Sequence, residues 1–285
     1  RLCRDWSSDV CSSDLIGTEN FKPKCSVIMN LSPDHLDVFA DLEEYYQAKT
    51  LIFKNMNDDD VFLLNMDDPE IVSRTIGLKC KVLTFSVDQP CDCYVKDGIV
   101  QLYGEPLFQL EDLQILGRHN VINAMVAGSM AYVLGIDRST IRQGIREFKG
   151  VEHRIEFVKE VNGVKYYNDS KGTNTDATII ALKSFSEPVI LLAGGYDKHT
   201  GFEDLRPYLS RVAKMIVYGA TKFQLKELYP AAFVVETLGE ALSLASQLSQ
   251  PGDTVLFSPA CASYDQFDNY EQRGKIFKNL VNNLE

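Results

Sequence analysis

The sequence lacks any run of eighteen apolar residues, and no charged segment followed by an apolar one opens it. The first absence argues against a membrane-spanning helix and the second against a secretory leader, so we expect a cytoplasmic protein. Positive charge is also scarce, with 29 lysines and arginines against 40 aspartates and glutamates. Broad nucleic-acid binding needs a basic surface, so any phosphate group must be bound by local cations.

Cysteine and histidine are too few and too irregular for a disulfide or zinc framework. Of the seven cysteines, Cys91 and Cys93 make one close pair, without a second pair at metal-binding spacing. We expect reduced thiols. The four histidines lie in polar clusters next to glycine or proline, which hints at functional sites; they are His35, His119, His153 and His199.

A chain of 285 residues with 45% hydrophobic content has room for two packed domains. Residues 1–15 repeat a Ser-Ser-Asp unit, carry the only tryptophan and show no helical or strand periodicity. We interpret them as a non-native or artefactual segment and leave them out of the fold prediction. A polar connector over 149–154 is expected to separate a first domain, 16–150, from a second, 151–285.

The first domain alternates strand and helix patterns, which is typical of α/β structure. Asp41 and Glu44 resemble a capping box at the start of one helix, and Asp97-Gly98 predicts a hairpin turn. The expected strands cover 26–31, 61–65 and 81–87, the hairpin 93–103, and the helices 42–53, 69–76, 117–134 and 137–148.

The second domain shows the same alternation more regularly, which predicts a Rossmann-like, mainly parallel sheet covered on both faces. Asn162-Gly163 predicts a hairpin within 155–167. Further strands are expected over 188–193, 214–218, 232–235 and 254–257, and helices after 173–175 and over 202–209, 221–228, 238–248 and 268–284.

Residues 167–176 form a polar turn between a strand and a helix. Thr173, Asn174 or Thr175 can cap that helix, whose first amide groups and positive dipole end then favour an anion. Lys171 would add a full charge there, and Asp169 could position a metal-bound water or a ribose hydroxyl. A plain polar loop with a good cap explains the decapeptide alone at least as well.

Two further strand ends carry polar clusters, at 194–199 and 258–267. Both should line one rim of the sheet, where α/β proteins bind ligands. Within the second cluster, Cys261 fits a small buried residue better than a nucleophile. In the first domain, Lys49 lies on a largely apolar helix face, where a lysine usually keeps its charged tip in water. Asn120 and Asn123 could reach one flat group or could serve helix capping and solvent exposure.

Together these motifs resemble the Mur ligase family, most closely its D-glutamate-adding members. The resemblance runs from about Ile16 to Glu285. Five motifs in the family's order carry it: Ser32-Pro-Asp-His-Leu-Asp37, Tyr46-Gln-Ala-Lys49, Gly117-Arg-His-Asn-x-x-Asn123, Asn168-Asp-Ser-Lys-Gly-Thr-Asn174 and Ser258-Pro-Ala-Cys-Ala-Ser-Tyr-Asp-Gln-Phe267. The pair His153-Arg154 supports them.

The resemblance implies an ATP-dependent amide ligase of peptidoglycan synthesis. ATP would phosphorylate the carboxylate of UDP-N-acetylmuramoyl-L-alanine, and the amine of D-glutamate would attack the acyl phosphate. His35 and a carbamylated Lys49 would hold Mg²⁺. The nucleotide would be bound by Asn120, Asn123, Arg154, Asp169, Lys171 and Thr173, and D-glutamate by Thr173, Lys198, Ser263, Tyr264 and Tyr270. Tyr264 and Tyr270 depart from the residue types of other members, which weakens the assignment of the finer amino-acid contacts. A monomer is expected.

None of the 18 glycines belongs to a loop ending in Gly-Lys-Ser or Gly-Lys-Thr, the cradle for ATP phosphates that the family carries. The expected architecture is therefore an incomplete central ATPase-type α/β domain followed by a Rossmann-like domain, in a truncated and inactive chain. Two alternatives remain: a non-catalytic nucleotide- or amino-acid-binding module, and another ligase of the same superfamily.

Overall fold

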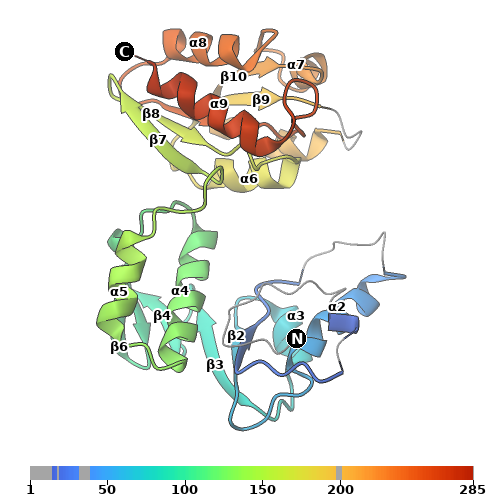
Figure 1. Cartoon of the computed structure of the whole chain (residues 1–285), viewed down its shortest axis with the longest axis vertical. Coiled ribbons are helices and arrows are strands. Elements are labelled where there is room, and N and C mark those ends of the chain that lie inside the picture. Colours follow the sequence, from blue (N-terminus) through green and yellow to red (C-terminus); the bar gives the residue numbers. More distant parts are fainter. Residues whose placement is uncertain (1–14, 18, 32–38, 197–200, 285) are drawn as a thin grey trace. The chain divides into compact units, whose positions relative to one another are not determined.

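The computed structural model describes residues 15–17, 19–31, 39–196 and 201–284. The chain divides into two compact units (Figure 1), one of Arg1–Leu113 with Val121–Glu147 and one of Gln114–Asn120 with Phe148–Glu285. Helix α4 begins in the second unit and continues in the first. Among the described helices, none has the length and apolar character to cross a bilayer.

The first unit is built on a six-stranded sheet in the order β1-β2-β3-β4-β5-β6. Strands β1 to β4 pair in parallel, and β4, β5 and β6 pair antiparallel. The strands are β1 (Cys25–Val27), β2 (Val61–Asn65), β3 (Lys81–Ser86), β4 (Cys93–Lys96), β5 (Ile99–Leu102) and β6 (Glu105–Gln109). The helices are α2 (Leu42–Thr50), α3 (Pro69–Arg74), α4 (Arg118–Val133) and α5 (Arg138–Glu147), with 3₁₀ turns η1 (Leu51–Phe53) and η2 (Leu110–Asp112).

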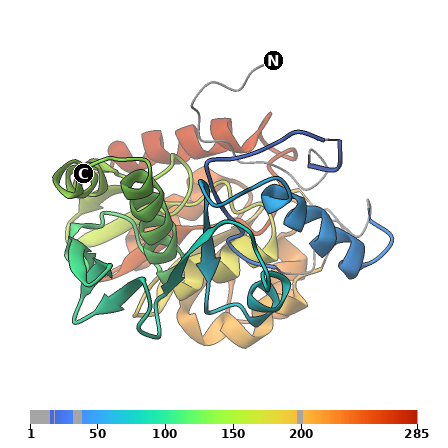
Figure 2. The ribbon, with the colours of Figure 1, turned by 90° about the horizontal axis from the view of Figure 1, so that it is seen from below.

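Alternate residues of β2 face the two sides of this sheet. Leu63 packs with Met125 of α4 and Ile141 of α5, whereas Phe62 packs with Ile71 of α3. Both faces of the sheet are therefore covered by packed side chains, as is usual for a mainly parallel sheet. Helix α2, in blue, lies at the opposite end of the unit from α4 and α5, in green (Figures 1 and 2).

The second unit is a doubly wound sheet in the order β11-β10-β9-β12-β8-β7, parallel except for the β7–β8 hairpin. Its strands are β7 (Glu156–Val161), β8 (Val164–Asn168), β9 (Val189–Gly194), β10 (Val212–Tyr218), β11 (Phe233–Val234) and β12 (Thr254–Phe257). Its helices are α6 (Thr175–Lys183), α7 (Lys222–Leu228), α8 (Leu238–Leu248) and α9 (Tyr270–Asn282), with the 3₁₀ helix η3 (Glu203–Arg211).

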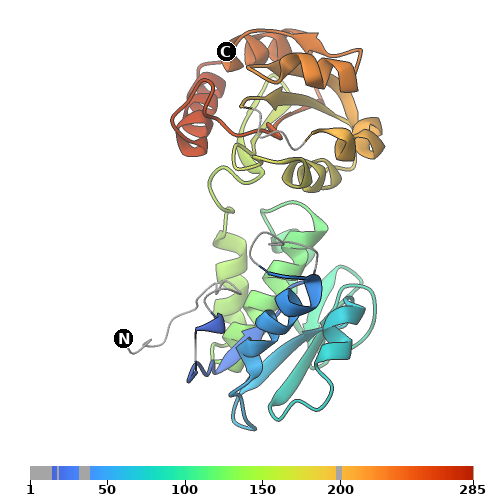
Figure 3. The ribbon, with the colours of Figure 1, turned by 90° about the vertical axis from the view of Figure 1, so that its right-hand side faces the viewer.

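Two apolar cores cover the two faces of that sheet. Helices α8 and α9 bury residues such as Leu242 and Phe277 on one face, and α6 and α7 bury residues such as Leu182 and Leu225 on the other. Figure 3 shows α9, in red, and α6, in olive, on different sides of the strands. The Rossmann-like prediction for this part of the fold is confirmed.

Local signals account for several element boundaries. Asn162 and Gly163 both adopt positive φ, 51° and 78°, which a two-residue type I′ hairpin turn requires. Asn174 caps α6 by accepting from the Ala177 amide at 2.9 Å. Asp41 caps α2 through the Glu44 amide in the same way.

Two local predictions are corrected, and one strand was missed. The strand expected over 26–31 ends at Val27, because the Met29 carbonyl accepts from the Asn65 side chain and the Leu31 amide donates to Asp68 instead of joining the ladder. The helix expected over 202–209 is 3₁₀, with Pro207 inside it, since proline lacks the amide an α-helix would use. Strand β6, which completes the hairpin sheet, was not predicted.

Candidate functional site

Polar loops gather at one rim of the second unit, where the parallel strands β8, β9, β10 and β12 end. The Gly194 amide donates to the Pro259 carbonyl at 2.9 Å, and the Tyr196 amide donates to the Ala262 carbonyl at the same distance. Thr221 bonds Gly195 through both its hydroxyl and its amide. These bonds connect the strand-end clusters that the sequence predicted on one rim.

The turn after β8 is folded around the Asp169 carboxyl. One carboxyl oxygen accepts from the Ser258 hydroxyl at 2.6 Å, and the other accepts from the Ile155 amide at 3.2 Å. Ser258 also bonds the Thr178 hydroxyl at 2.9 Å. Burial raises the pKa of Asp169 from 3.8 to about 7, although the Ser258 hydrogen bond and the positive charge of Arg154 partly offset it.

Two exposed cations border this turn. The Lys171 ammonium lies 5.9 Å from the Tyr270 ring centroid, while its amide donates to the His153 carbonyl at 3.0 Å. Arg154 is close enough to act electrostatically on Asp169, Tyr270 and His119. Burial and the charge of Arg154 lower the pKa of His119. Together with the N-terminal amides of α6, these cations make the turn an environment that favours anions.

His153 is buried directly behind the turn. Its Nδ1 lies 2.9 Å from the Asn168 side-chain amide, whose nitrogen can only donate, so the imidazole proton belongs on Nε2. Burial lowers the pKa of His153, which favours this neutral form. Asn168 in turn accepts from the Ser170 amide at 3.1 Å. His153 therefore supports the backbone that presents Lys171.

Glu152, His153 and Glu156 are close enough together to suggest a metal site. The Lys278 ammonium, however, already lies 3.0 Å from Glu152 Oε1 and 2.5 Å from Glu156 Oε1. The other ring nitrogen of His153, Nδ1, is already occupied by the Asn168 amide at 2.9 Å. The cluster is an ion-pair network that fastens α9 to the hairpin.

Two of the predicted amino-acid contacts, Ser263 and Tyr264, lie in the loop after β12. Ser263 is buried, and Tyr264 is exposed with its ring 6.2 Å from that of Tyr196. Cys261 is buried, with its sulfur 3.3 Å from the Thr221 hydroxyl, as expected for a structural thiol. Thr173 lies half-buried in the neighbouring turn. Lys198 lies outside the described residues.

In the first unit, the Lys49 ammonium donates to the Asn30 carbonyl at 3.4 Å and lies 4.7 Å from the Tyr45 ring centroid. His35 lies outside the described residues. Asn120 donates from its side chain to the Leu116 carbonyl at 2.7 Å, and Asn123 is exposed on α4. Asn120 lies inside α4 and its side chain donates here, so this bond is not an N-cap, in which a side-chain oxygen accepts from a helix amide.

Arg273 belongs to none of the predicted motifs, yet it is fully buried against the rim. A signal was available: Arg273 lies three residues after Tyr270 and four before Phe277, on the inward face of the last helix. An arginine at such spacing is either a paired charge or a clamp for carbonyl groups.

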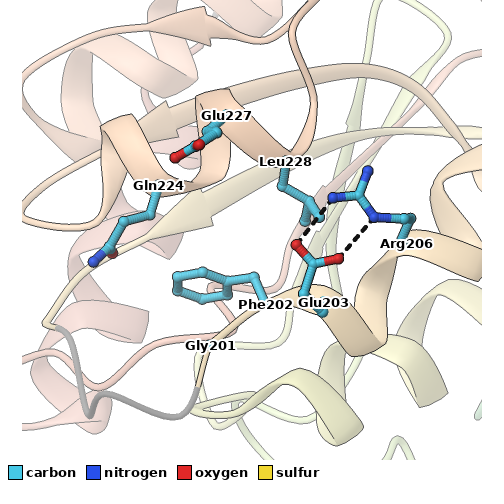
Figure 4. Close-up of a pocket in the computed structure, with 7 residues that line it drawn as sticks. All are labelled: Gly201, Phe202, Glu203, Arg206, Gln224, Glu227 and Leu228. Atoms are coloured by element: carbon cyan, nitrogen blue, oxygen red, sulfur yellow. Dashed lines mark hydrogen bonds and ion pairs between the residues drawn. The ribbon is translucent and has the colours of Figure 1, made fainter.

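A separate cleft of about 410 Å³ lies between η3 and α7 (Figure 4). Its wall includes the Glu203–Arg206 ion pair, with an N–O distance of 2.7 Å. None of its lining residues belongs to the predicted site; they are Gly201, Phe202, Glu203, Arg206, Gln224, Glu227 and Leu228.

Comparison with known proteins agrees with this architecture. Residues 7–131 match the model of the Mur ligase middle domain, and residues 153–261 match that of the Mur ligase, glutamate ligase domain. The UDP-N-acetylmuramoylalanine–D-glutamate ligase of Caldanaerobacter subterraneus is 42% identical over 287 residues, covering 97% of this chain and 64% of that protein. Its Bacillus subtilis counterpart is 37% identical over 284 residues, covering 97% and 63%.

Solved structures show the same fold at low identity. A UDP-N-acetylmuramate-alanine ligase from Thermotoga maritima superposes with a TM-score of 0.66 at 20% identity, over 91% of this chain and 60% of that one. A MurF ligase from the same organism, in complex with ADP, gives 0.63 at 16%, over 92% and 63%. The chain spans just under two thirds of the length of its curated relatives. With both domain models matched in order, this chain belongs to the Mur ligase family.

Proposed function

We propose that this chain is part of an ATP-dependent ligase that adds D-glutamate to UDP-N-acetylmuramoyl-L-alanine in peptidoglycan synthesis. The observation that carries the proposal is the rim at which Lys171, Arg154 and the start of α6 surround one polar turn. Relatives 37 to 42% identical over 97% of the chain bear that activity in their names.

The proposed chemistry matches this arrangement. A carboxylate becomes electrophilic after it accepts the γ-phosphoryl group, and cations must offset the charge that develops during that transfer. Lys171 and Arg154 supply those cations. In the proposal, Asn120, Asn123, Asp169 and Thr173 bind the rest of the nucleotide. The amine of D-glutamate then attacks the acyl phosphate, and phosphate leaves.

D-glutamate carries anionic groups and needs a cation with hydroxyl or backbone donors. The proposed contacts are Lys198, Thr173, Ser263, Tyr264 and Tyr270. Ser263 and Tyr264 follow β12, and Tyr270 begins α9, so these side chains come from the loop beside the nucleotide turn. This neighbourhood would bring the amine close to an acyl phosphate formed at the turn.

We propose His35 and a carbamylated Lys49 as Mg²⁺ ligands. Mg²⁺ takes oxygen ligands, and the unmodified Lys49 is a cation held by a carbonyl and an aromatic face. The described residues around it therefore do not fit the ion without that modification, and no step here depends on it. The domain assignment that we propose is 16–150 for the central ATP-binding part and 151–285 for the ligase part, in a monomer of the cytoplasm.

The test joins residues 16–285 to the N-terminal third of the Caldanaerobacter relative and measures phosphate release. We expect release only when ATP, UDP-N-acetylmuramoyl-L-alanine and D-glutamate are all present. Release with a diamino acid in place of D-glutamate would favour another ligase of the superfamily. A fusion that binds ADP but never ligates would favour a binding module.

A further inference from the structure

Arg273 stands out because its guanidinium is fully buried and is held by neutral oxygens. Its relative exposure is 0%, although an arginine side chain is normally in contact with solvent. The partners are one hydroxyl and three carbonyl groups, with no carboxylate among its hydrogen bonds in the described part of the chain. A charge is costly to bury in this way unless its hydrogen bonds are satisfied.

Those oxygens come from two separate loops. On one side, Arg273 Nε donates to the Ser170 hydroxyl at 3.1 Å, and one terminal nitrogen donates to the Ser170 carbonyl at 2.8 Å. On the other side, the Cys261 and Ala262 carbonyls each accept at 3.0 Å. Ser170 and Arg273 are 103 residues apart in the sequence. One side chain thus connects the turn after β8 to the loop after β12.

Helix α9 holds the first loop at further points. The Ser170 hydroxyl donates to the Tyr270 carbonyl at 2.8 Å. Gly274 lets the helix approach the buried His153 ring, which a Cβ at that position would overlap. The next residue after Ser170 is Lys171, and the next after Ala262 is Ser263. Arg273 therefore fixes the backbone directly before a proposed nucleotide contact and a proposed D-glutamate contact.

We propose that Arg273 is a positioning residue that holds the nucleotide turn and the amino-acid loop in one mutual arrangement. The planar guanidinium presents several N–H groups in fixed directions, so it can serve both loops at once, whereas a lysine ammonium is a single point of charge. The assignment of the two loops rests on the proposed function, but the connection between them does not.

Hydrogen exchange on the 285-residue chain tests this. We expect Arg273→Met to accelerate exchange in both 168–174 and 258–267 by at least about tenfold, while β10 and α7 stay protected. Val281→Ala is the matched control, because Val281 is equally buried on the same helix and belongs to its apolar core. That variant should lower the melting temperature without selective loss of protection at the two loops.

A folded Arg273→Met variant in which one loop, or neither, loses protection would overturn the proposal. If Arg273→Met fails to fold, Arg273→Lys tests the proposal instead. Wild-type protection of both loops in Arg273→Lys would show that the planar guanidinium is not needed to hold them, which would overturn the proposal. ADP affinity, measured on the same samples, should weaken about tenfold in Arg273→Met and stay unchanged in Val281→Ala. Absence of ADP binding by the wild-type chain would count against the proposed function, while the exchange result would still decide the role of Arg273.

Discussion

At the residue scale, Asp169 is held where its protonated form is favoured. The carboxyl is buried, and its strongest hydrogen bond comes from a neutral hydroxyl. Proteins retain such costly groups mainly at functional sites. The raised pKa of Asp169 makes ionisation of this group costly to the folded state as pH rises towards 7 and above.

The first prediction concerns Asp169→Asn and pH. Burial raises the native pKa of Asp169 to about 7 from 3.8, so the native state keeps its proton between those values while the unfolded state has lost it. The stability contributed by this group is therefore full below about pH 4 and is lost as pH rises through 7. Relative to wild type, we expect Asp169→Asn to gain stability from pH 4 to 8, by at most about 4 kcal/mol.

Urea unfolding of wild type and Asp169→Asn across that pH range measures the difference in their free energies of unfolding. The contributions of the other titrating groups are the same in both proteins and cancel in that difference. Asn can still accept from the Ile155 amide and donate to Ser258, so the turn should persist. A difference that is flat with pH would contradict the raised pKa. We also expect weaker ADP binding in the variant, since the carboxyl group of the proposed nucleotide contact is replaced by an amide.

Lys171 allows a prediction about charge alone. Lys171→Met keeps the length of the side chain and removes its cation, so ADP affinity of the chain should fall by about tenfold or more. Lys165→Met removes another exposed lysine, from β8 and outside the proposed site, and should leave the affinity unchanged. Titration calorimetry compares the three proteins. Equal weakening by both variants would point to a general effect of net charge.

At the element scale, the start of α6 shapes the anion site. Asn174 is its cap, and Asn174→Ala should cost about 1 kcal/mol of unfolding free energy in the second unit. Asn174→Asp keeps the acceptor oxygen and adds a negative charge at the positive end of the helix, so it should retain stability. Denaturant unfolding of the three proteins provides the measurement. A stable Asn174→Ala variant would mean that packing alone fixes this end of α6.

Elements with strong local patterns were predicted closely from sequence. Helix α8 and strands β2 and β12 have the expected bounds, because apolar periodicity and turn residues agree there. Strand β1 is shorter than predicted, since side chains distant in sequence take over its backbone bonds. The same limit applies to the site: motifs located the turn of Asp169 and Lys171, but the link from Arg273 to Ser170 depends on tertiary contacts.

At the scale of the whole molecule, net charge and local charge differ in sign. The chain carries a formal charge of −11, yet its proposed nucleotide turn is bordered by Lys171 and Arg154. Long-range attraction therefore cannot gather a nucleotide, and binding must come from short contacts at the rim. We therefore expect the affinity of this chain for ADP to be modest.

The last prediction separates binding from turnover. The printed 285 residues hold no Gly-Lys-Ser or Gly-Lys-Thr loop, whose amides would cradle the ATP phosphates. Phosphoryl transfer depends on holding the phosphates in line with the attacking carboxylate. With ATP, magnesium and both substrates, we therefore expect no phosphate release from this chain, while calorimetry still detects ADP. Release that requires both UDP-N-acetylmuramoyl-L-alanine and D-glutamate would show that the rim of the second unit can position ATP without that loop.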